Sequence, residues 1–355
     1  MGFDPRAIAR EHLRILAYYE EKLTEEEKLR ARRDPHSFRE PRFCGLTVHL
    51  ARGGCPYRCT YCYIYDMGFG ENAEPYPLSP EELAYAILTN RNFLATRYGT
   101  LLAVGSVTEP FLFADRAIMF LTEISKLGNP IQFSTKAYIS KALASKLSRV
   151  NAPLSPLVTI ITLELSDMLE PYAPKPQLRL ETLRNLREVG LRPCLFLRPI
   201  IPGVTDHEAV AIMRTAKEWG AECVVVGTLR VTRNIIIRLR RLGVETRNIE
   251  KRVSMKELEK YPDRQIPVPL KPAERRELRI SAKRLGLVVF RTACCANSYN
   301  AGVPCPSVCF ETKFCTKCPN ECWLRPRPSI DHVREALRIL GVTTRITFDG
   351  RRILV

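Results

Sequence analysis

Cysteines are the residues of this sequence whose type and spacing could do chemistry. The chain has 13 of them, and only Cys44, Cys194 and Cys223 stand alone. In a protein kept reduced, tight groups of thiols indicate metal ligation, and an odd total fits poorly with complete disulfide pairing. For the second group, disulfides remain an alternative, since cytosolic proteins of hyperthermophiles can contain them. The first group is Cys55, Cys59 and Cys62, and the second is Cys294, Cys295, Cys305, Cys309, Cys315, Cys318 and Cys322.

The first group lies in the stretch GGCPYRCTYCY, with three and then two residues between successive thiols. Three thiolates on one short loop can hold three irons of a [4Fe–4S] cube and leave the fourth iron without a protein ligand. An open coordination position is what a catalytic metal site needs. The alternative is a structural zinc loop, which would need a fourth ligand that the neighbouring sequence does not offer.

Apolar runs and amphipathic stretches alternate between about residues 43 and 228, so this part of the chain positions the first group. Continuous apolar strands separated by helices predict a parallel sheet buried on both faces. Such units can close partway into a barrel or form an open doubly wound sheet, and in both the ligands gather at the carboxyl ends of the strands. The expected strands are 46–50, 101–107, 131–135, 157–165, 194–200 and 223–227, with helices near 80–97, 115–127, 139–149, 177–189 and 206–219.

Helix-start signals and composition divide the rest of the chain. Ser79 and Glu82 predict a capping box, and Asp115 and Asp206 are expected to cap helices as well. We expect four segments, with a terminal hairpin turning at Asp349-Gly350. They are an N-terminal helical segment (1–40), the sheet domain (41–230), a basic helical segment with a Pro-rich linker (231–290) and a Cys-rich metal-binding region (291–355).

The C-x3-C-x2-C pattern, with an aromatic residue before its third cysteine, resembles the signature of the radical S-adenosylmethionine (SAM) enzymes. The resemblance implies an α/β fold, a partial (β/α)6 TIM-type barrel, here with N-terminal helices and a Cys-rich C-terminal extension. It also implies a [4Fe–4S] cluster on Cys55, Cys59 and Cys62. The open iron of this cluster would bind S-adenosylmethionine and cleave it to a 5′-deoxyadenosyl radical that abstracts hydrogen from a substrate.

Three further stretches resemble the spore photoproduct lyase branch and its photolyase-like relatives: GSVTEPFLFAD (105–115), FSTKA (133–137) and residues 169–206, which include PIIPG. In that branch the corresponding residues contact S-adenosylmethionine. The implied contacts are Tyr61 and Ile200 to adenine, Ser106, Thr108 and Glu109 to the methionine amino group, Lys136 to its carboxylate, and Thr162 and Glu164 to the ribose.

One position departs from the branch. True spore photoproduct lyases carry a hydrogen-donating cysteine in the segment after the second strand, where this chain has Ser106. A serine hydroxyl is a far poorer hydrogen-atom donor than a thiol. We therefore expect chemistry other than thymine-dimer repair by that route.

The density of the second cysteine group predicts another metal centre. An auxiliary [4Fe–4S] cluster is favoured, and a structural zinc knuckle is the alternative because zinc also accepts four thiolates. The surplus thiols could hold a further cluster or form a redox-active Cys294-Cys295 pair. The expected ligands are Cys309, Cys315, Cys318 and Cys322.

The chain carries a formal charge of +17 from 55 Lys+Arg and 38 Asp+Glu. Excess basic residues could neutralise phosphates, although a solvated basic face is the alternative. No apolar run approaches the roughly 18 residues of a membrane span. The candidate phosphate contacts are Arg230, Arg233, Arg238, Arg240, Arg241, Arg247, Arg275, Arg276 and Lys283.

Together these features predict a cytoplasmic radical SAM enzyme that modifies a base of RNA or DNA. Ferredoxin or flavodoxin would be the reducing partner, and no membrane is involved. Two alternatives stay open: radical modification of a protein or peptide, and a non-catalytic iron–sulfur or zinc protein that binds RNA.

Overall fold

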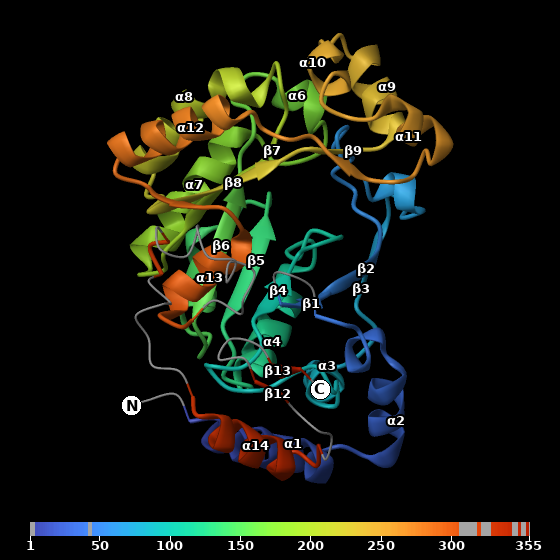
Figure 1. The fold of residues 1–355 in the computed structure, drawn as a ribbon, viewed down its shortest axis with the longest axis vertical. Coiled ribbons are helices and arrows are strands. Elements are labelled where there is room, and N and C mark those ends of the chain that lie inside the picture. Colours follow the sequence, from blue (N-terminus) through green and yellow to red (C-terminus); the bar gives the residue numbers. More distant parts are fainter. Residues whose placement is uncertain are drawn as a thin grey trace.

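A parallel sheet forms the centre of the molecule (Figure 1). The structure is a computed structural model that describes residues 4–41, 45–304, 318–320, 328–342, 347–348 and 353–354. Within these residues the main sheet has seven strands, every neighbouring pair is parallel, and the order is β1-β4-β5-β6-β7-β8-β11. The strands are β1 (Leu46–Val48), β4 (Leu102–Val104), β5 (Ile131–Thr135), β6 (Leu154–Thr159), β7 (Cys194–Ile200), β8 (Cys223–Thr228) and β11 (Val288–Phe290).

Helices connect the successive strands, because parallel neighbours can be joined only by crossover connections. This confirms the predicted α/β fold of the partial-barrel type. The connecting helices are α3 (Pro80–Leu88), α4 (Ala114–Ser125), α5 (Lys141–Ser148), α6 (Ser166–Leu169), α7 (Pro176–Glu188), α8 (Thr205–Glu218) and α12 (Pro272–Arg284).

The capping predictions had mixed outcomes. Ser79 and Glu82 form the expected capping box at the start of α3. Asp115 and Asp206 do not occupy N-cap positions; they lie in the first turns of α4 and α8, where an acidic side chain still interacts favourably with the helix dipole.

The strand expected at 157–165 is displaced: β6 begins earlier and ends at Thr159. Just beyond β6, side-chain oxygens accept hydrogen bonds from the backbone amides. The carboxylate of Glu208 accepts hydrogen bonds from the amides of Leu163 at 2.6 Å and Glu164 at 3.3 Å, and the Thr162 hydroxyl accepts one from Leu165 at 2.9 Å. Such local bonds compete with strand pairing and turn the chain into α6.

Side chains of the central strands alternate between the helix layer and the opposite side of the sheet. On β7, Leu195 and Leu197 pack into the main apolar core together with Ile212 of α8. Phe196 packs instead against a separate cluster that includes Val225 of β8. We call the side of the sheet lined by Phe196 and Val225 the inner face.

The helix α13 (Ala293–Ala301) lies against the inner face at the amino ends of the strands. Cys295 packs with Cys194 and Cys223, the paired first residues of β7 and β8. The Asn297 amide lies 3.3 Å from the carbonyl oxygen of Pro130, just before β5. This helix therefore covers the end of the barrel opposite the carboxyl ends of the strands.

Peripheral elements surround the sheet. The helices α1 (Pro5–Lys22) and α2 (Glu25–Arg33) confirm the predicted N-terminal helices, and α1 packs beside α14 (Ile330–Ile339) near the other end of the chain (Figure 1). None of the helices in the described part is long and apolar enough to cross a membrane. The remaining elements are η1 (Pro35–Ser37), β2 (Ala51–Gly53), η2 (Tyr65–Met67), β3 (Ala73–Pro75), β9 (Arg230–Val231), α9 (Arg233–Arg241), α10 (Arg247–Glu250), α11 (Met255–Lys260), β10 (Ile266–Pro267), β12 (Thr347–Phe348) and β13 (Ile353–Leu354).

Two buried histidines, His12 and His36, and the half-buried His49 should make stability depend on pH. His12 and His36 each accept a hydrogen bond from a backbone amide, at 3.1 Å, and burial lowers the pKa of both imidazoles. Burial also lowers the pKa of His49 to about 3. Unfolded histidine titrates near pH 6.5, so the unfolded chain binds more protons as the pH falls. The contribution of these neutral histidines to the free energy of unfolding is therefore fully present above about pH 6.5. It decreases progressively as the pH falls below that value.

Urea unfolding at about pH 7 and about pH 5 tests this expectation, with a decrease of up to roughly 1.4 kcal/mol per pH unit from each histidine. His49→Gln should flatten the dependence. An unfolding free energy that does not change between these pH values in the wild type would contradict it.

Candidate functional site

The first cysteine group lies on a loop that follows β2 and faces the carboxyl ends of the parallel strands. Cys59 is buried, and Cys55 and Cys62 are half-buried. Gly54 lets this loop form, because a Cβ at that position would lie 1.5 Å from the carbonyl oxygen of Gly70. The three thiols are therefore presented from a loop whose backbone is closely packed.

Electrostatics couple the three thiols to Lys136, the residue that follows β5. Burial raises the pKa of Cys59 to about 12 and raises the pKa values of Cys55 and Cys62. The ammonium group of Lys136 acts in the opposite direction on all three thiols because it lies near each of them. Burial on its own would lower the pKa of Lys136. The negative charges of Cys59 and Glu170 have the larger effect together, so the pKa of Lys136 is raised.

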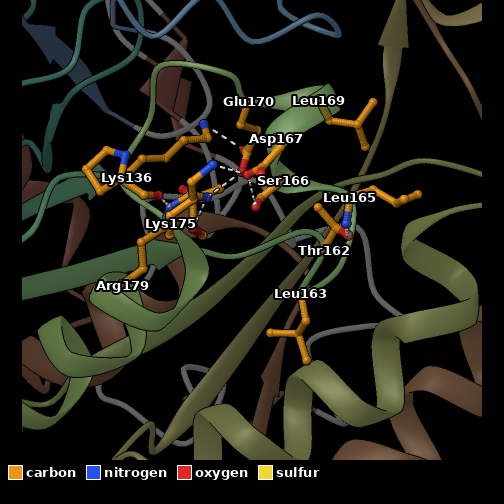
Figure 2. A network of polar contacts seen from close by, with 12 residues as sticks. Lys136, Thr162, Leu163, Leu165, Ser166, Asp167, Leu169, Glu170, Lys175 and Arg179 are labelled. Carbon is orange, nitrogen blue, oxygen red and sulfur yellow. Dashed lines mark hydrogen bonds and ion pairs between the residues drawn. The ribbon is translucent and has the colours of Figure 1, made fainter. Parts of the chain in front are cut away.

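A buried carboxylate organises the same region (Figure 2). Glu170 accepts hydrogen bonds from the Tyr61 hydroxyl and from Nη1 of Arg179, the latter at 2.5 Å. The ammonium nitrogen of Lys136 lies 3.9 Å from Glu170 and 5.7 Å from the centre of the Tyr61 ring. The side chains of Glu170 and Arg179 have no solvent exposure. We call Tyr61, Lys136, Glu170 and Arg179 the Glu170 network.

These residues fit an anionic cluster. The donor set is three thiols, and the half-buried Lys136 and the buried Arg179 share one carboxylate, which leaves positive charge to balance thiolates. Nη2 of Arg179 is buried with no hydrogen-bond partner in the described part of the chain. Among the described residues no three Cys, His, Asp or Glu side chains converge as ligands of one ion would. A cube does not require such convergence, because each thiolate binds a different iron.

The residues expected to bind the methionine group of S-adenosylmethionine lie beside this loop. Glu109 is buried, and its carboxylate accepts hydrogen bonds from the Thr135 hydroxyl at 2.6 Å and the Lys136 amide at 2.9 Å. Burial raises the pKa of Glu109. Glu109 thus joins the ends of β4 and β5. Thr108 is buried, whereas Ser106 is exposed.

The residues expected near the adenosine have different surroundings. Ile200 is buried at the end of β7. Thr162 is fully buried and donates its hydroxyl hydrogen to Glu208, which argues against a contact with ribose. Glu164 is exposed and stays available. Both follow β6 rather than lying on it.

Arg238 of α9 binds the cysteine loop through hydrogen bonds, a role that the sequence did not reveal. Its guanidinium donates to the carbonyl oxygens of Thr60 at 2.9 Å and Cys62 at 3.1 Å. It also donates to both carboxylate oxygens of Asp66, at 2.8 and 3.0 Å, while Thr232 donates to Asp66 at 2.6 Å. The sequence interpretation of Arg238 as a phosphate contact does not fit this geometry. An acidic residue four positions after the third cysteine was the available signal.

The second cysteine group lies elsewhere, as far as it is described. Cys294 and Cys295 are buried on α13, at the amino ends of the strands, and both lie near the Thr292 hydroxyl. The Asn320 amide donates to the carbonyl oxygen of Cys295 at 3.2 Å, which brings the segment with Cys318 to the same end. The other three expected ligands, Cys309, Cys315 and Cys322, lie outside the described residues.

Comparisons with known proteins agree with this architecture. Residues 52–216, from β2 to α8, match the family model of the radical SAM superfamily. The fold is similar to that of a spore photoproduct lyase variant with bound S-adenosylmethionine and dinucleoside spore photoproduct: TM-score 0.55, 15% identity, covering 73% of this chain and 81% of the other. A second variant of that enzyme gives a TM-score of 0.52 at 17% identity, covering 70% and 76%.

A curated relative is the uncharacterized protein ORF301 of Acidianus two-tailed virus. It is 26% identical over 164 residues, which are 42% of this chain and 54% of that protein. The chain therefore spans about half the length of this relative.

The grip of Arg238 on the cysteine loop can be tested through iron retention. Arg238→Gln removes the guanidinium that donates hydrogen bonds to the carbonyl oxygens of Thr60 and Cys62. It also leaves the buried Asp66 carboxylate without its cation. We expect roughly 10-fold faster iron loss to a chelator from the reconstituted protein, as for other residues that orient metal ligands. Arg241→Gln, on the exposed side of the same helix, is the matched control. Equal rates of iron loss in the two variants would contradict this role.

Proposed function

We propose that this chain, whose residues 52–216 match the radical SAM family model, is a radical SAM enzyme that abstracts hydrogen from a nucleic-acid base. The superfamily implies a [4Fe–4S] cluster and S-adenosylmethionine, which together supply a 5′-deoxyadenosyl radical when bound. A one-electron donor such as ferredoxin or flavodoxin completes the proposed system.

The proposed cluster ligands are Cys55, Cys59 and Cys62. Lys136 is proposed to bind the methionine carboxylate, because its ammonium group is half-buried beside the thiols and its only described carboxylate partner, Glu170, lies as far as 3.9 Å away. Both carboxylate oxygens of Glu109 are engaged by the chain itself, so Glu109 is assigned to hold Lys136 in place.

An exposed tyrosine beside the cysteine loop carries the proposal of a base as substrate. Tyr172 has 60% of its surface exposed, and the guanidinium of Arg58 lies 5.1 Å from its ring centre. Arg58 is itself part of the loop, between Cys55 and Cys59. An exposed aromatic ring backed by a guanidinium is a platform on which a base can stack.

Two further observations support a nucleic-acid substrate. The net charge of +17 favours a polyanionic partner. The fold is similar to that of an enzyme whose structure holds a dinucleoside ligand. Because Ser106 replaces the hydrogen-donating cysteine expected in that branch, the proposed reaction is modification of a base rather than repair of a thymine dimer.

The radical chemistry has a direct product assay. Anaerobically reconstituted protein with dithionite and S-adenosylmethionine should release 5′-deoxyadenosine. Cys59→Ala should release none above an enzyme-free background, because one of three thiol ligands is lost. Cys223→Ala, a buried core cysteine, is the control and should remain active. Equal product from the Cys59 variant and the wild type would place the cluster elsewhere.

The substrate class is tested by single-stranded RNA and DNA binding at several salt concentrations. Binding should weaken steeply with salt, and Tyr172→Ala should weaken it by about 5- to 100-fold, the usual range for loss of one stacking ring. Tyr18→Ala is the control, since Tyr18 is an exposed tyrosine on α1, with 48% of its surface accessible. Absence of binding at low salt would overturn the nucleic-acid proposal.

A further inference from the structure

Arg198 lies on the inner face of the sheet, although it belongs to a largely apolar strand. Its guanidinium lies 5.9 Å from the ring centre of Phe196, the inner-face residue two positions earlier on β7. The pairing of β7 with β8 is irregular between Leu197 and Ile200. Such irregularities re-aim side chains next to active sites.

Gly227 of β8 provides the space that the Arg198 side chain occupies. A Cβ at Gly227 would lie 2.4 Å from Cδ, 2.6 Å from Cγ and 2.9 Å from Cβ of Arg198. Because backbone strain is not involved, the glycine is required here by contact alone. The arginine therefore crosses β8 along a path that any larger residue would block.

The charge of Arg198 lacks an anionic partner, unlike the other cations near the cysteine loop. Within the described residues it makes no hydrogen bond or ion pair. By contrast, each of the other four cations near the loop lies within ion-pair distance of a carboxylate. Arg58 pairs with Glu71, Lys136 and Arg179 both pair with Glu170, and Arg238 pairs with Asp66. A half-buried guanidinium without a carboxylate partner is suited to bind an anionic group of a ligand.

Arg198 lies near the end of β7 that adjoins the cysteine loop. Ile201, three residues further along, packs in one apolar cluster with Cys59 and Tyr61. The end of β7 therefore adjoins the cysteine loop, while Lys136 follows β5, two strands away in the sheet. A cation on β7 is placed to serve a different anion from the one assigned to Lys136.

We propose that Arg198 binds a phosphate of the nucleotide substrate, with Gly227 holding open the path of its side chain. This inference rests on the proposed nucleic-acid function. A guanidinium recognises phosphate oxygens through two parallel hydrogen bonds, which fixes the orientation as well as the position of the ligand. The stacking platform at Tyr172 and the phosphate site at Arg198 would then hold two parts of one nucleotide segment.

The test uses the reconstituted enzyme with S-adenosylmethionine and no reductant. Its probes are homodinucleoside monophosphates and their neutral methylphosphonate analogues, which differ only in the charge of the linkage. We expect the wild type to bind the charged probe about 10-fold more tightly, as a charge-assisted bidentate contact allows. Arg198→Gln should remove this preference, and Arg198→Lys should restore part of it. Gly227→Ala, which displaces the side chain, should weaken it.

Arg192→Gln is the control, since Arg192 pairs with Glu222 at 2.7 Å and precedes β7. Retention of the charge preference in Arg198→Gln would overturn the phosphate site while leaving the nucleic-acid function intact. Weaker S-adenosylmethionine binding in that variant would overturn it by assigning Arg198 to the cofactor. If no dinucleoside binds to the wild type, the proposed function fails together with the inference. Binding of an acidic peptide that depends on Arg198 would likewise overturn the assignment to a nucleotide.

Discussion

The carboxylate of Glu170 is the interaction on which the site depends. It joins three parts of the chain that are distant in sequence: the cysteine loop through Tyr61, the end of β5 through Lys136, and α7 through Arg179. Buried ion pairs add little net stability, because desolvation offsets their attraction, but removal of one partner is strongly destabilising. The network is therefore best understood as a device that fixes geometry. It holds a positive charge beside the thiols, where a negatively charged cluster would need it.

Within the described residues, the first cysteine group and the α13 cysteines of the second group lie at opposite ends of the sheet. The first faces the carboxyl ends of the strands, and Cys294 and Cys295 pack at the amino ends, against Leu101 and Cys194. A metal centre that includes Cys318, whose neighbour Asn320 contacts Cys295, would lie toward the amino ends of the strands and away from the first group. Such a centre could stabilise the end of the barrel or relay electrons.

The fold and the cysteine loop could be predicted because each has a local signature. Alternating apolar runs give the parallel sheet, and the thiol spacing identifies the loop as a candidate cluster site. The Glu170 network could not be predicted in the same way, because Glu170 and Arg179 are ordinary helix-forming residues whose burial depends on tertiary contacts. Arg238 was misassigned for a related reason. Its neighbours Arg240 and Arg241 are exposed, and only the fold distinguishes a loop-binding arginine from a solvated one. Sequence patterns report which residues are charged, whereas partners are settled by packing.

The positive charge of the chain can now be divided by partner. Arg238 is engaged by the cysteine loop, Arg240 pairs with Glu250 and Arg247 with Glu245, whereas Arg233, Arg275 and Arg276 are exposed. Exposed pairs contribute little energy and exchange readily for a phosphate, so these residues can still attract a polyanion at long range. Selectivity for one nucleotide requires groups that a substrate meets only inside the barrel. Arg198 is such a group, since its charge is unpaired within the described structure and its path is kept open by Gly227. Long-range attraction and local recognition are therefore assigned to different arginines.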